Sequence, residues 1–561
     1  MDEVPAQYAP DVSPNEFLAT DRLPEGQQVC VGVLFVGAGP AGLAGAIRLA
    51  QLLNGAPAIK ERLGEFPVAV IEKGKYPGAH LLSGAVVNPG PFHTLFPQLT
   101  AADFPFAQSV PAERVYFLTP RRAWRMPVPP TMRNHGNMIA SLSRVGAWLG
   151  QQAEAAGVMI LNETTGVKML VQDGVVSGVR TGDKGRGKDG APLANFEPGV
   201  DLVAHWTVMS DGGTSPLTSA MLHHFGVARR HPQIYALGVK EVWEVPTALD
   251  AILHTMGWPL RTGRAFREFG GSFAYPVGPN RVALGMVVGL DYADASLSVH
   301  HLLQALKEHP LFRRVLAGGK HVDQWWGAKT IPEGGYAALP TQFHLPGACV
   351  VGDAAGFVNV PALKGIHYAM RSGIYAAEAI FAALAAQQPE RTLVGYDVAI
   401  RNSFIMQELY AVRNVRQAYH YGFWMGSLLA GCMLLTGGRF PGGIWGLEAD
   451  AMHPVSDGGR EWPRADGHLT FDKLTGVHAS GNRSRDHQPN HLRVTTAVPD
   501  VIGKTWIRMC PAEVYEWGPG GVGARRLVMN PTNCVQCGAI SAKGGLLTPP
   551  EGGSGPEYTE M

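Results

Sequence analysis

The 561-residue sequence has little cysteine, almost no net charge and no long apolar run. Its 47 Lys and Arg balance 46 Asp and Glu to a formal net charge of +1, so nothing indicates nucleic acid or a strongly anionic surface as a partner. The six cysteines include no closely spaced secreted framework, which favours a reducing compartment and free thiols or metal ligands. The N-terminal stretch MDEVPAQYAP is acidic and lacks an apolar core, so we expect neither a signal peptide nor an Arg-rich transit peptide.

A dinucleotide-binding pattern stands near the N-terminus. The buried-strand run Val31–Val36 turns at Gly37-Ala38-Gly39-Pro40-Ala41-Gly42 and enters an Ala- and Leu-rich helix. In such a turn the first glycine allows the bend, the second lets backbone approach a pyrophosphate, and the third lets helix and strand pack closely. A second strand, 66–71, ends in Glu72, which is placed to accept hydrogen bonds from a ribose diol.

A second fingerprint about three hundred residues later favours FAD over NAD. The strand Ala348–Val351 leads into Gly352-Asp353-Ala-Ala-Gly356 and a helix expected near 362. Asp353 is placed to bind a ribityl hydroxyl while helix amides face the pyrophosphate. Between the two fingerprints, a strand ending at Asp211-Gly212-Gly213 matches another recurrent element of FAD-binding folds, or an ordinary turn.

The remaining segments predict two further domains. Residues 112–132 have the composition of a basic loop, and 226–325 show antiparallel strand patterns typical of a substrate domain inserted in a nucleotide-binding fold. The Pro- and Gly-rich tail contains Cys510-Pro-Ala and Cys534-Val-Gln-Cys537, a spacing that indicates either iron–sulfur ligands or inert buried thiols.

Two segments without formal charge are candidates for a membrane surface. Residues 77–98 could form either a buried loop beside a flavin or an exposed apolar surface. The apolar part of 417–438 runs over 15 residues (421–435), shorter than the about 20 that a membrane span needs. Flanking Arg413, Arg416 and Arg439 favour an interfacial helix; a buried core helix and a full span are the alternatives.

From residue 30 to the C-terminus the chain resembles the electron-transfer flavoprotein:ubiquinone oxidoreductase family. The motifs that carry the resemblance are GAGPAGL, IEK, GAH, LSGA, NHGN, WLGQQAEAAGV, HTMGWPL, GGSFAY, LGMVVGLDY, GFVNVPALKG, ELYAVRNVR, DHQPNHL, CPAEVYE and PEGGSGPEY.

The resemblance implies an α/β plus α+β protein with four segments. These are an FAD-binding Rossmann-like domain of glutathione-reductase type (30–225), an inserted antiparallel quinone domain (226–325), a second FAD part with a membrane-associated helix (326–450), and a ferredoxin-like domain (451–561). It further implies FAD, a [4Fe–4S] cluster held by Cys510, Cys534 and Cys537, and a quinone site at Gly270–Gly271.

The expected reaction takes electrons from reduced electron-transfer flavoprotein to a membrane quinone, and no catalytic side chain is assigned. The expected location is monotopic, on the inner face of an energy-conserving membrane: the bacterial cytoplasmic or the mitochondrial inner membrane. The segments 77–98 and 418–437 correspond to the family's membrane surface.

One position departs from the family pattern. The fourth cluster cysteine is Ile540, so the cluster is three-iron, four-iron with Ser541 or water as a ligand, or absent. Two other functions stay open: another FAD enzyme such as a polyprenyl reductase or aromatic hydroxylase, which would not need the cysteine tail, and a non-enzymatic flavoprotein scaffold or electron relay.

Overall fold

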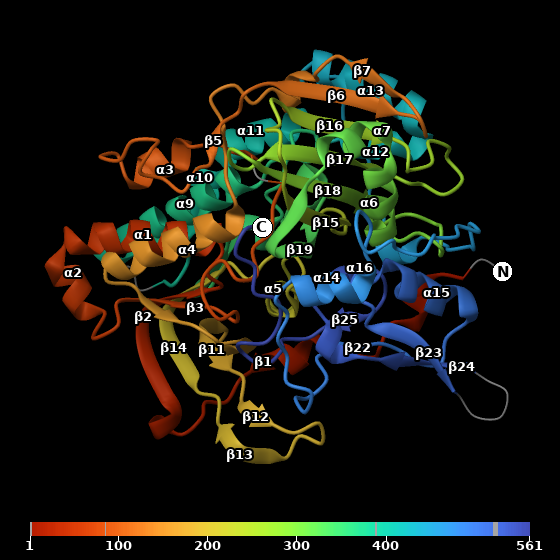
Figure 1. Cartoon of the computed structure of the whole chain (residues 1–561). Coiled ribbons are helices and arrows are strands. Elements are labelled where there is room, and N and C mark those ends of the chain that lie inside the picture. Colours follow the sequence, from red (N-terminus) through yellow and green to blue (C-terminus); the bar gives the residue numbers. More distant parts are fainter. Residues whose placement is uncertain (1–2, 85, 388–389, 520–524) are drawn as a thin grey trace.

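The structure is a computed structural model that describes residues 3–84, 86–387, 390–519 and 525–561 (Figure 1). Its first large sheet has nine strands in the order β1-β10-β11-β14-β2-β3-β9, with β21 beside β14 and β20 beside β21. The strands are β1 (Leu18–Ala19), β2 (Gln28–Val36), β3 (Val68–Ile71), β9 (Met159–Leu161), β10 (Gly166–Gln172), β11 (Val175–Thr181), β14 (Asp201–Met209), β20 (His344–Leu345) and β21 (Ala348–Val350).

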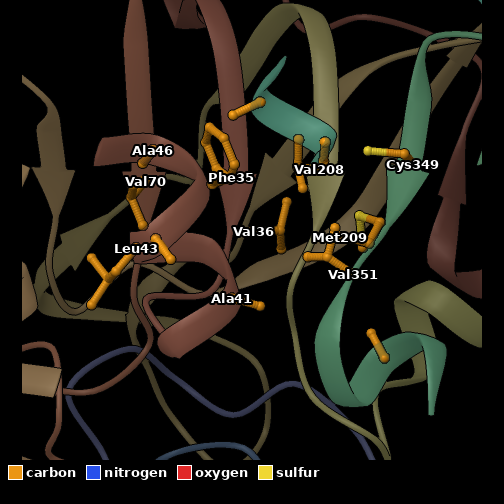
Figure 2. Close-up of a cluster of buried hydrophobic side chains, with 14 of the residues drawn as sticks. Phe35, Val36, Ala41, Leu43, Ala46, Val70, Val208, Met209, Cys349 and Val351 are labelled. Atoms are coloured by element: carbon orange, nitrogen blue, oxygen red, sulfur yellow. The ribbon is translucent and has the colours of Figure 1, made fainter. Parts of the chain in front are cut away.

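The centre of this sheet is parallel, as the apolar runs predict. Strand β2 pairs in parallel with β3 and β14, and β14 pairs in parallel with β21. Figure 2 shows the buried side chains between these strands and helix α1 (Pro40–Asn54). Both predicted strands and the helix after the glycine turn are confirmed.

Helix α1 packs between α4 (Leu142–Ala155) and α9 (Ile366–Ala385). The crossing with α9 depends on small residues, because a Cβ at Gly373 would lie 2.0 Å from the Ala41 carbonyl oxygen. Helix α9 follows the second fingerprint directly, so this close crossing brings the two fingerprints to one edge of the sheet.

The second large sheet has the order β19-β15-β18-β17-β16-β6-β7. Its strands are β6 (Glu113–Leu118), β7 (Ala123–Met126), β15 (Tyr235–Glu244), β16 (Ile252–Gly257), β17 (Gly270–Pro276), β18 (Arg281–Gly289) and β19 (Lys320–Pro332). The antiparallel pattern predicted within 226–325 is confirmed for β15, β17 and β18. The loop predicted at 112–132 is wrong: β6 and β7 form a hairpin, and β6 pairs in parallel with β16.

Most described residues of the segment 77–98 (all but 85) are buried or half-buried in the protein, and its large apolar side chains are not exposed, so its assignment to a membrane surface is wrong. It holds β4 (Val86–Val87) and α3 (Gly90–Leu95). The Phe92 side chain is fully buried, and its ring centroid lies 5.5 Å from that of Phe104 and 6.4 Å from that of Trp148 on α4. The absence of charge in this segment therefore fits packing against the rest of the protein.

The C-terminal segment shares one hydrophobic core with the second sheet. Trp326 on β19 and Trp506 on α15 (Asp500–Met509) are both fully buried in that core. The segment also contains α14 (Lys473–Ala479), α16 (Ala539–Ala542), the strand pair β22 (Leu492–Arg493) with β25 (Leu546–Leu547), and the pair β23 (Tyr515–Pro519) with β24 (Arg525–Met529).

The other elements connect or cover the sheets. They are α2 (Pro57–Arg62), β5 (Gln108–Ser109), β8 (Met138–Ile139), the hairpin β12 (Lys184–Arg186) and β13 (Pro192–Glu197), α5 (Pro216–His224), α6 (Val299–Glu308), α7 (Pro310–Val315), α8 (Gly352–Ala355), α10 (Val394–Asn402), α11 (Phe404–Ala411), α12 (Val415–Ala418) and α13 (Phe423–Leu435).

Candidate functional site

One cavity of about 580 Å³ connects the first fingerprint to the far side of the second sheet. Its wall includes Gly37 and Gly39 of the glycine turn, the pair Gly270–Gly271 at the start of β17, and Phe423 on α13. The cavity therefore joins the predicted dinucleotide site, the predicted quinone site and the predicted membrane helix.

The glycines of the turn have different tasks. Gly37 has φ +109°, and a Cβ there would lie 2.6 Å from the Ser210 carbonyl oxygen; a Cβ at Gly42 would lie 2.2 Å from the Gly37 carbonyl oxygen. A Cβ at Gly39 would meet no protein atom closer than 4.0 Å. Gly37 and Gly42 are thus required by the fold, whereas Gly39 leaves open space on the wall of the cavity.

Glu72 lies at the end of β3 on the same wall. Its carboxylate accepts hydrogen bonds from the backbone N–H groups of Ala38 (3.1 Å) and Gly74 (2.7 Å), and its burial raises its pKa. Each oxygen keeps a lone pair for a further donor. The carboxylate therefore fixes the glycine turn and can still accept from a ligand hydroxyl.

Asp353 comes from α8, at the second fingerprint, and also lines the cavity. Burial raises its pKa to about 6, against the opposing effect of the Lys329 ammonium. Gly356 is the C-cap of α8 with φ +93°, and a Cβ there would lie 2.6 Å from Gln233 Nε2. Gly356, like Ala38 and Gly42, is not among the residues of the cavity wall.

Asp211 presents an unsatisfied acceptor to the cavity. Its Oδ1 accepts from the Thr218 hydroxyl at 2.6 Å, while its buried Oδ2 has no hydrogen-bond partner among the described residues. A buried carboxylate oxygen without a donor is costly unless a ligand supplies one. Together with the open space at Gly39, this oxygen fits a polyhydroxylated ligand such as FAD.

Two lysines on the wall were not anticipated from the sequence. Burial, together with repulsion from Lys329, lowers the pKa of Lys73 to about 7, and burial likewise lowers the pKa of Lys329. Lys73 directly follows Glu72, and Lys329 lies on β19, far away in the sequence. Only the fold brings the two ammonium groups together, so no local pattern could have revealed them.

The pair Gly270–Gly271 lacks side chains for a reason that the sheet alone explains. Gly270 has φ +152°, and a Cβ there would lie 2.1 Å from the Val287 carbonyl oxygen; one at Gly271 would lie 2.4 Å from the Thr255 carbonyl oxygen. At both positions a Cβ would clash with the backbone of a neighbouring strand. A bulky residue at 271 would therefore disturb the sheet, and such a variant cannot isolate quinone binding.

The cysteine loop lies directly against the cavity wall. The backbone N–H and the hydroxyl of Thr330 both donate to the Cys537 carbonyl oxygen (2.9 and 2.8 Å), and Lys329 Nζ donates to the Gln536 carbonyl oxygen (3.4 Å). Lys329, Thr330 and Gln536 all line the cavity. The tail thus places its thiols next to the predicted flavin site.

Three of the four positions of a cluster site carry thiols. Cys510 Sγ accepts from the Val514 N–H (3.5 Å) and Cys534 Sγ from the Gln536 N–H (3.4 Å), contacts that stabilise cluster thiolates. Burial, and after it the nearby thiols of Cys510, Cys534 and Cys537, raise the pKa of Tyr515, so all three cysteines lie close to this one residue.

Ile540 lies in α16 with 5% of its surface exposed, and its side chain has no atom that can coordinate iron. Across the described ranges of the chain, no group of three or more His, Cys, Asp or Glu could hold a metal ion. A four-iron cluster uses a different geometry, with one thiolate for each iron. The residues therefore fit a cluster at three corners and leave the fourth without a protein thiolate.

The cavity opens beside an exposed apolar surface, which we call the apolar face. It consists of the outer sides of α13 and of the β6–β7 hairpin, which lie together at the top of Figure 1. Trp424 and Leu428 on α13 are both 63% exposed, and Trp124 on β7 is 54% exposed. Phe117 on β6 joins the two elements, because its ring centroid lies 5.2 Å from that of Phe423 and 5.1 Å from that of Trp424.

Helix α13 has a buried and an exposed side, so the alternative of a buried core helix is wrong. Gly426, Ala430 and Met433 are buried, opposite the exposed residues. Within the described part of the chain, no helix combines the length and apolarity that crossing a bilayer takes.

Comparisons with known proteins identify relatives along almost the whole chain. A family model described as "ETF-QO, ubiquinone-binding" matches residues 235–331, and one described as "Electron transfer flavoprotein-ubiquinone oxidoreductase, 4Fe-4S" matches 467–559. The mitochondrial electron transfer flavoprotein-ubiquinone oxidoreductase of Dictyostelium discoideum is 36% identical, covering 97% of this chain and 93% of that protein. The protein of that name from Homo sapiens is 37% identical, covering 94% and 89%.

Among solved structures, the chain is similar to a geranylgeranyl bacteriochlorophyll reductase-like protein from Thermoplasma acidophilum. The TM-score is 0.54 at 17% identity, with 76% of this chain and 95% of that one covered. At this identity the likeness shows a shared fold and nothing about the cofactor or the substrate.

We predict that Gly39→Val abolishes retention of FAD without unfolding the protein. The Cβ position at Gly39 has no protein atom closer than 4.0 Å, but a side chain there would occupy the space where the backbone would approach the pyrophosphate. Gly55→Val at the C-cap of α1 is the matched control, since it adds the same side chain away from the cavity. Flavin absorbance per protein and the melting temperature are the measurements. A Gly39→Val protein that keeps full FAD would show that the turn is not the binding site.

Proposed function

The chain belongs to the electron transfer flavoprotein-ubiquinone oxidoreductase family, and we propose that it takes electrons from reduced electron-transfer flavoprotein and delivers them to a membrane quinone. The observation that carries this proposal is the single cavity that runs from the glycine turn past Gly270–Gly271 to the apolar face. A redox cofactor at one end and a lipid-soluble acceptor entering at the other would meet inside it.

FAD and an iron–sulfur cluster are the cofactors of this enzyme. Bound FAD would supply a centre that accepts electrons singly and releases them in pairs. We assign its binding to the turn 37–42, with Gly39 next to the pyrophosphate, and to the carboxylates of Glu72 and Asp353. Ala38, Gly42 and Gly356 support this site through the backbone rather than by contact.

The quinone site is assigned to the cavity wall around Gly270–Gly271. Support comes from the ubiquinone-binding family model, whose match over 235–331 includes the pair, and from the apolar approach past α13. We retain the division into segments 30–225, 226–325, 326–450 and 451–561, with one change: the hairpin β6–β7 is assigned to the quinone domain because it completes that sheet.

The apolar face is the proposed membrane contact, with the protein attached to one leaflet on the inner face of an energy-conserving membrane. Exposed Trp and Leu on α13 and Trp on β7 are the side chains that favour an interface. Arg121, Arg122 and Arg125 on the hairpin are placed to meet lipid headgroups.

The assay that tests the function measures quinone reduction by the purified holoprotein with reduced electron-transfer flavoprotein as donor. We expect turnover with a soluble ubiquinone analogue, because the FAD reduced by the donor and the quinone would meet in the same cavity. NADPH with an isoprenoid or with a hydroxylatable aromatic serves as the comparison. Turnover only with NADPH would contradict the proposal and favour a reductase or hydroxylase, and no turnover with any pair would favour an electron relay.

We predict that Trp424→Lys combined with Leu428→Lys releases the protein from lipid vesicles. Transfer of each of these exposed side chains from water into lipid is favourable by about 2 kcal/mol. Their loss should therefore lower the vesicle partition coefficient by at least about a hundredfold. Flotation with neutral vesicles in high salt isolates this apolar contribution. Val394→Lys with Val398→Lys, at exposed positions on α10, is the control and should float like the unaltered protein. Equal flotation of all three would rule out the apolar face.

We predict that any cluster in the native protein has one labile iron and that Ile540→Cys stabilises it. Ile540 provides no ligand, whereas a thiolate there would complete four soft ligands. After anaerobic reconstitution and exposure to air, we expect a three-iron signal by electron paramagnetic resonance in the native protein and retained four-iron cluster in the variant. Ile540→Ser, a weaker ligand of similar reach, should be intermediate. Absence of acid-labile sulfide from both native protein and Ile540→Cys would mean that the tail is purely structural.

A further inference from the structure

The loop that carries Cys534 and Cys537 has a lysine ammonium group directly against it. Lys329 Nζ donates to the carbonyl oxygen of Gln536, between these two cysteines, at 3.4 Å. Burial lowers the pKa of Lys329, and the charge of Cys537 is the first of those that act against burial. The ammonium of Lys329 therefore lies within electrostatic range of the Cys537 sulfur.

Lys73 has the same relation to Cys534. It lies beside Lys329 on the cavity wall and is half-buried, and its ammonium group makes no hydrogen bond with the described residues. Burial and the Lys329 charge lower its pKa to about 7, and the charges of Glu72 and Cys534 act against both. The two ammonium groups thus share one small region next to the cysteine loop.

A third lysine lies beside Cys510. Lys473, the first residue of α14, is 6% exposed, and its Nζ donates to the carbonyl oxygens of Ile507 (2.9 Å) and Arg508 (3.4 Å), just before this cysteine. Burial lowers the pKa of Lys473 to about 8, and the charge of Cys510 is the first that acts against it. Each of the three cluster cysteines therefore has its own lysine, from three distant parts of the sequence.

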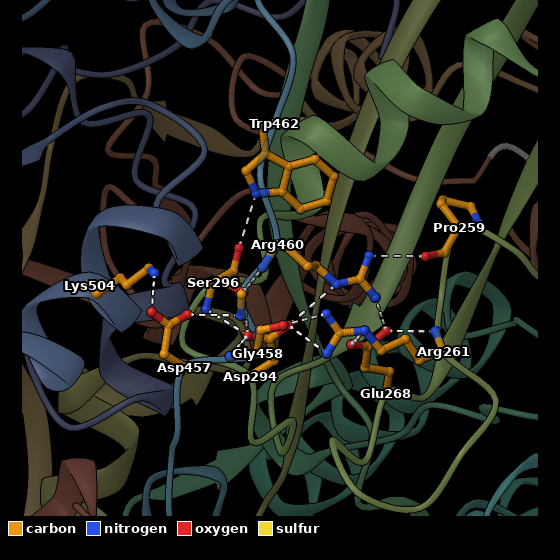
Figure 3. A network of polar contacts seen from close by, with 11 residues as sticks. Pro259, Arg261, Glu268, Asp294, Ser296, Asp457, Gly458, Arg460, Trp462 and Lys504 are labelled. Carbon is orange, nitrogen blue, oxygen red and sulfur yellow. Dashed lines mark hydrogen bonds and ion pairs between the residues drawn. The ribbon is translucent and has the colours of Figure 1, made fainter.

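These lysines, which we call the lysine triad, lack carboxylate partners. Figure 3 shows how two arginines elsewhere are balanced: Asp294 Oδ2 lies 3.3 Å from both Arg460 Nε and Arg261 Nη1. Outside 1–2, 85, 388–389 and 520–524, no carboxylate forms an ion pair with any member of the triad, which consists of Lys73, Lys329 and Lys473. A buried ammonium without an anion is costly, so the triad indicates a negatively charged group among its members.

The feature that all three lysines share is the cysteine set and not the cavity. Lys73 and Lys329 line the cavity, where dinucleotide phosphates would also supply negative charge. Lys473 is not among the residues of the cavity wall. The Glu513 carboxylate also acts on Lys473, but it is exposed and therefore screened by water. A single anion that explains all three lysines lies at the cysteines.

We propose that the lysine triad supplies the positive charge that balances an iron–sulfur cluster held by Cys510, Cys534 and Cys537, and that it raises the reduction potential of this cluster. The inference rests on the proposed function, in which the electron comes from reduced electron-transfer flavoprotein. The potential of a cluster depends on the net charge around it. Reduction adds one electron and thus one negative charge, so fixed ammonium groups nearby stabilise the reduced form more than the oxidised form.

The test measures the midpoint potential of the cluster in the reconstituted protein by a redox titration followed by electron paramagnetic resonance. Lysine to methionine removes the charge and keeps a side chain of similar length. We expect Lys329→Met and Lys473→Met each to lower the equilibrium constant for one-electron reduction by about tenfold, which is about 59 mV. Lys473→Met should also keep its full content of FAD, because this side chain does not line the cavity.

Two further kinds of variant separate charge from packing. Lys329→Arg and Lys473→Arg keep the charge and should retain the potential of the unaltered protein. Lys240→Met is the matched control: Lys240 is 1% exposed on β15, its Nζ donates to the Ser83 carbonyl oxygen (3.1 Å), and no cysteine charge acts on it. This variant also loses a buried ammonium group, and its cluster potential should not change. The melting temperature of each variant reports damage to packing.

The inference and the proposed function fail in different ways. An unchanged potential in both Lys329→Met and Lys473→Met would overturn the inference, and so would an equal fall in Lys240→Met. Loss of FAD from Lys329→Met with an unchanged cluster potential would assign that lysine to the dinucleotide phosphates and also overturn it. Absence of acid-labile sulfide from the reconstituted native protein would leave the triad nothing to balance and overturn the inference, whereas the proposed function is decided by quinone reduction.

Discussion

The attachment of the cysteine loop to strand β19 is the interaction on which the arrangement of the site depends. The Thr330 N–H donates to the Cys537 carbonyl oxygen at 2.9 Å, and the neighbouring Lys329 reaches both the cysteine loop and the cavity. Because β19 is also the edge strand of the second sheet, one segment holds the C-terminal tail, the cavity wall and the sheet in fixed relation. Electron transfer between cofactors needs such fixed, short separations.

The two ends of the cavity differ in polarity in a way that suits this function. Its inner end carries carboxylates and lysines around the glycine turn, where a polar, negatively charged dinucleotide would need partners. Its outer end lies beside Phe423 and opens next to the apolar face, where a hydrophobic quinone would arrive.

Local patterns in the sequence predicted the parts whose function depends on the backbone. The strand, the glycine turn and its helix are specified within sixteen residues (31–46), and the structure confirms them. The hairpin β6–β7 was not predictable, because β7 is exposed along its whole length and β6 pairs with β16, which is far away in the sequence. The prediction of a membrane surface at 77–98 was wrong because the absence of charged residues does not distinguish burial in protein from contact with lipid.

Photolabelling with an azidoquinone tests most directly whether one cavity serves both the flavin and the quinone. After irradiation of the FAD-loaded protein and digestion, mass spectrometry locates the adducts. We expect adducts on the wall segments 254–273 and 415–434, and we expect an excess of ubiquinone analogue to prevent them. Adducts confined to other surfaces, or adducts on these segments that ubiquinone does not prevent, would contradict it.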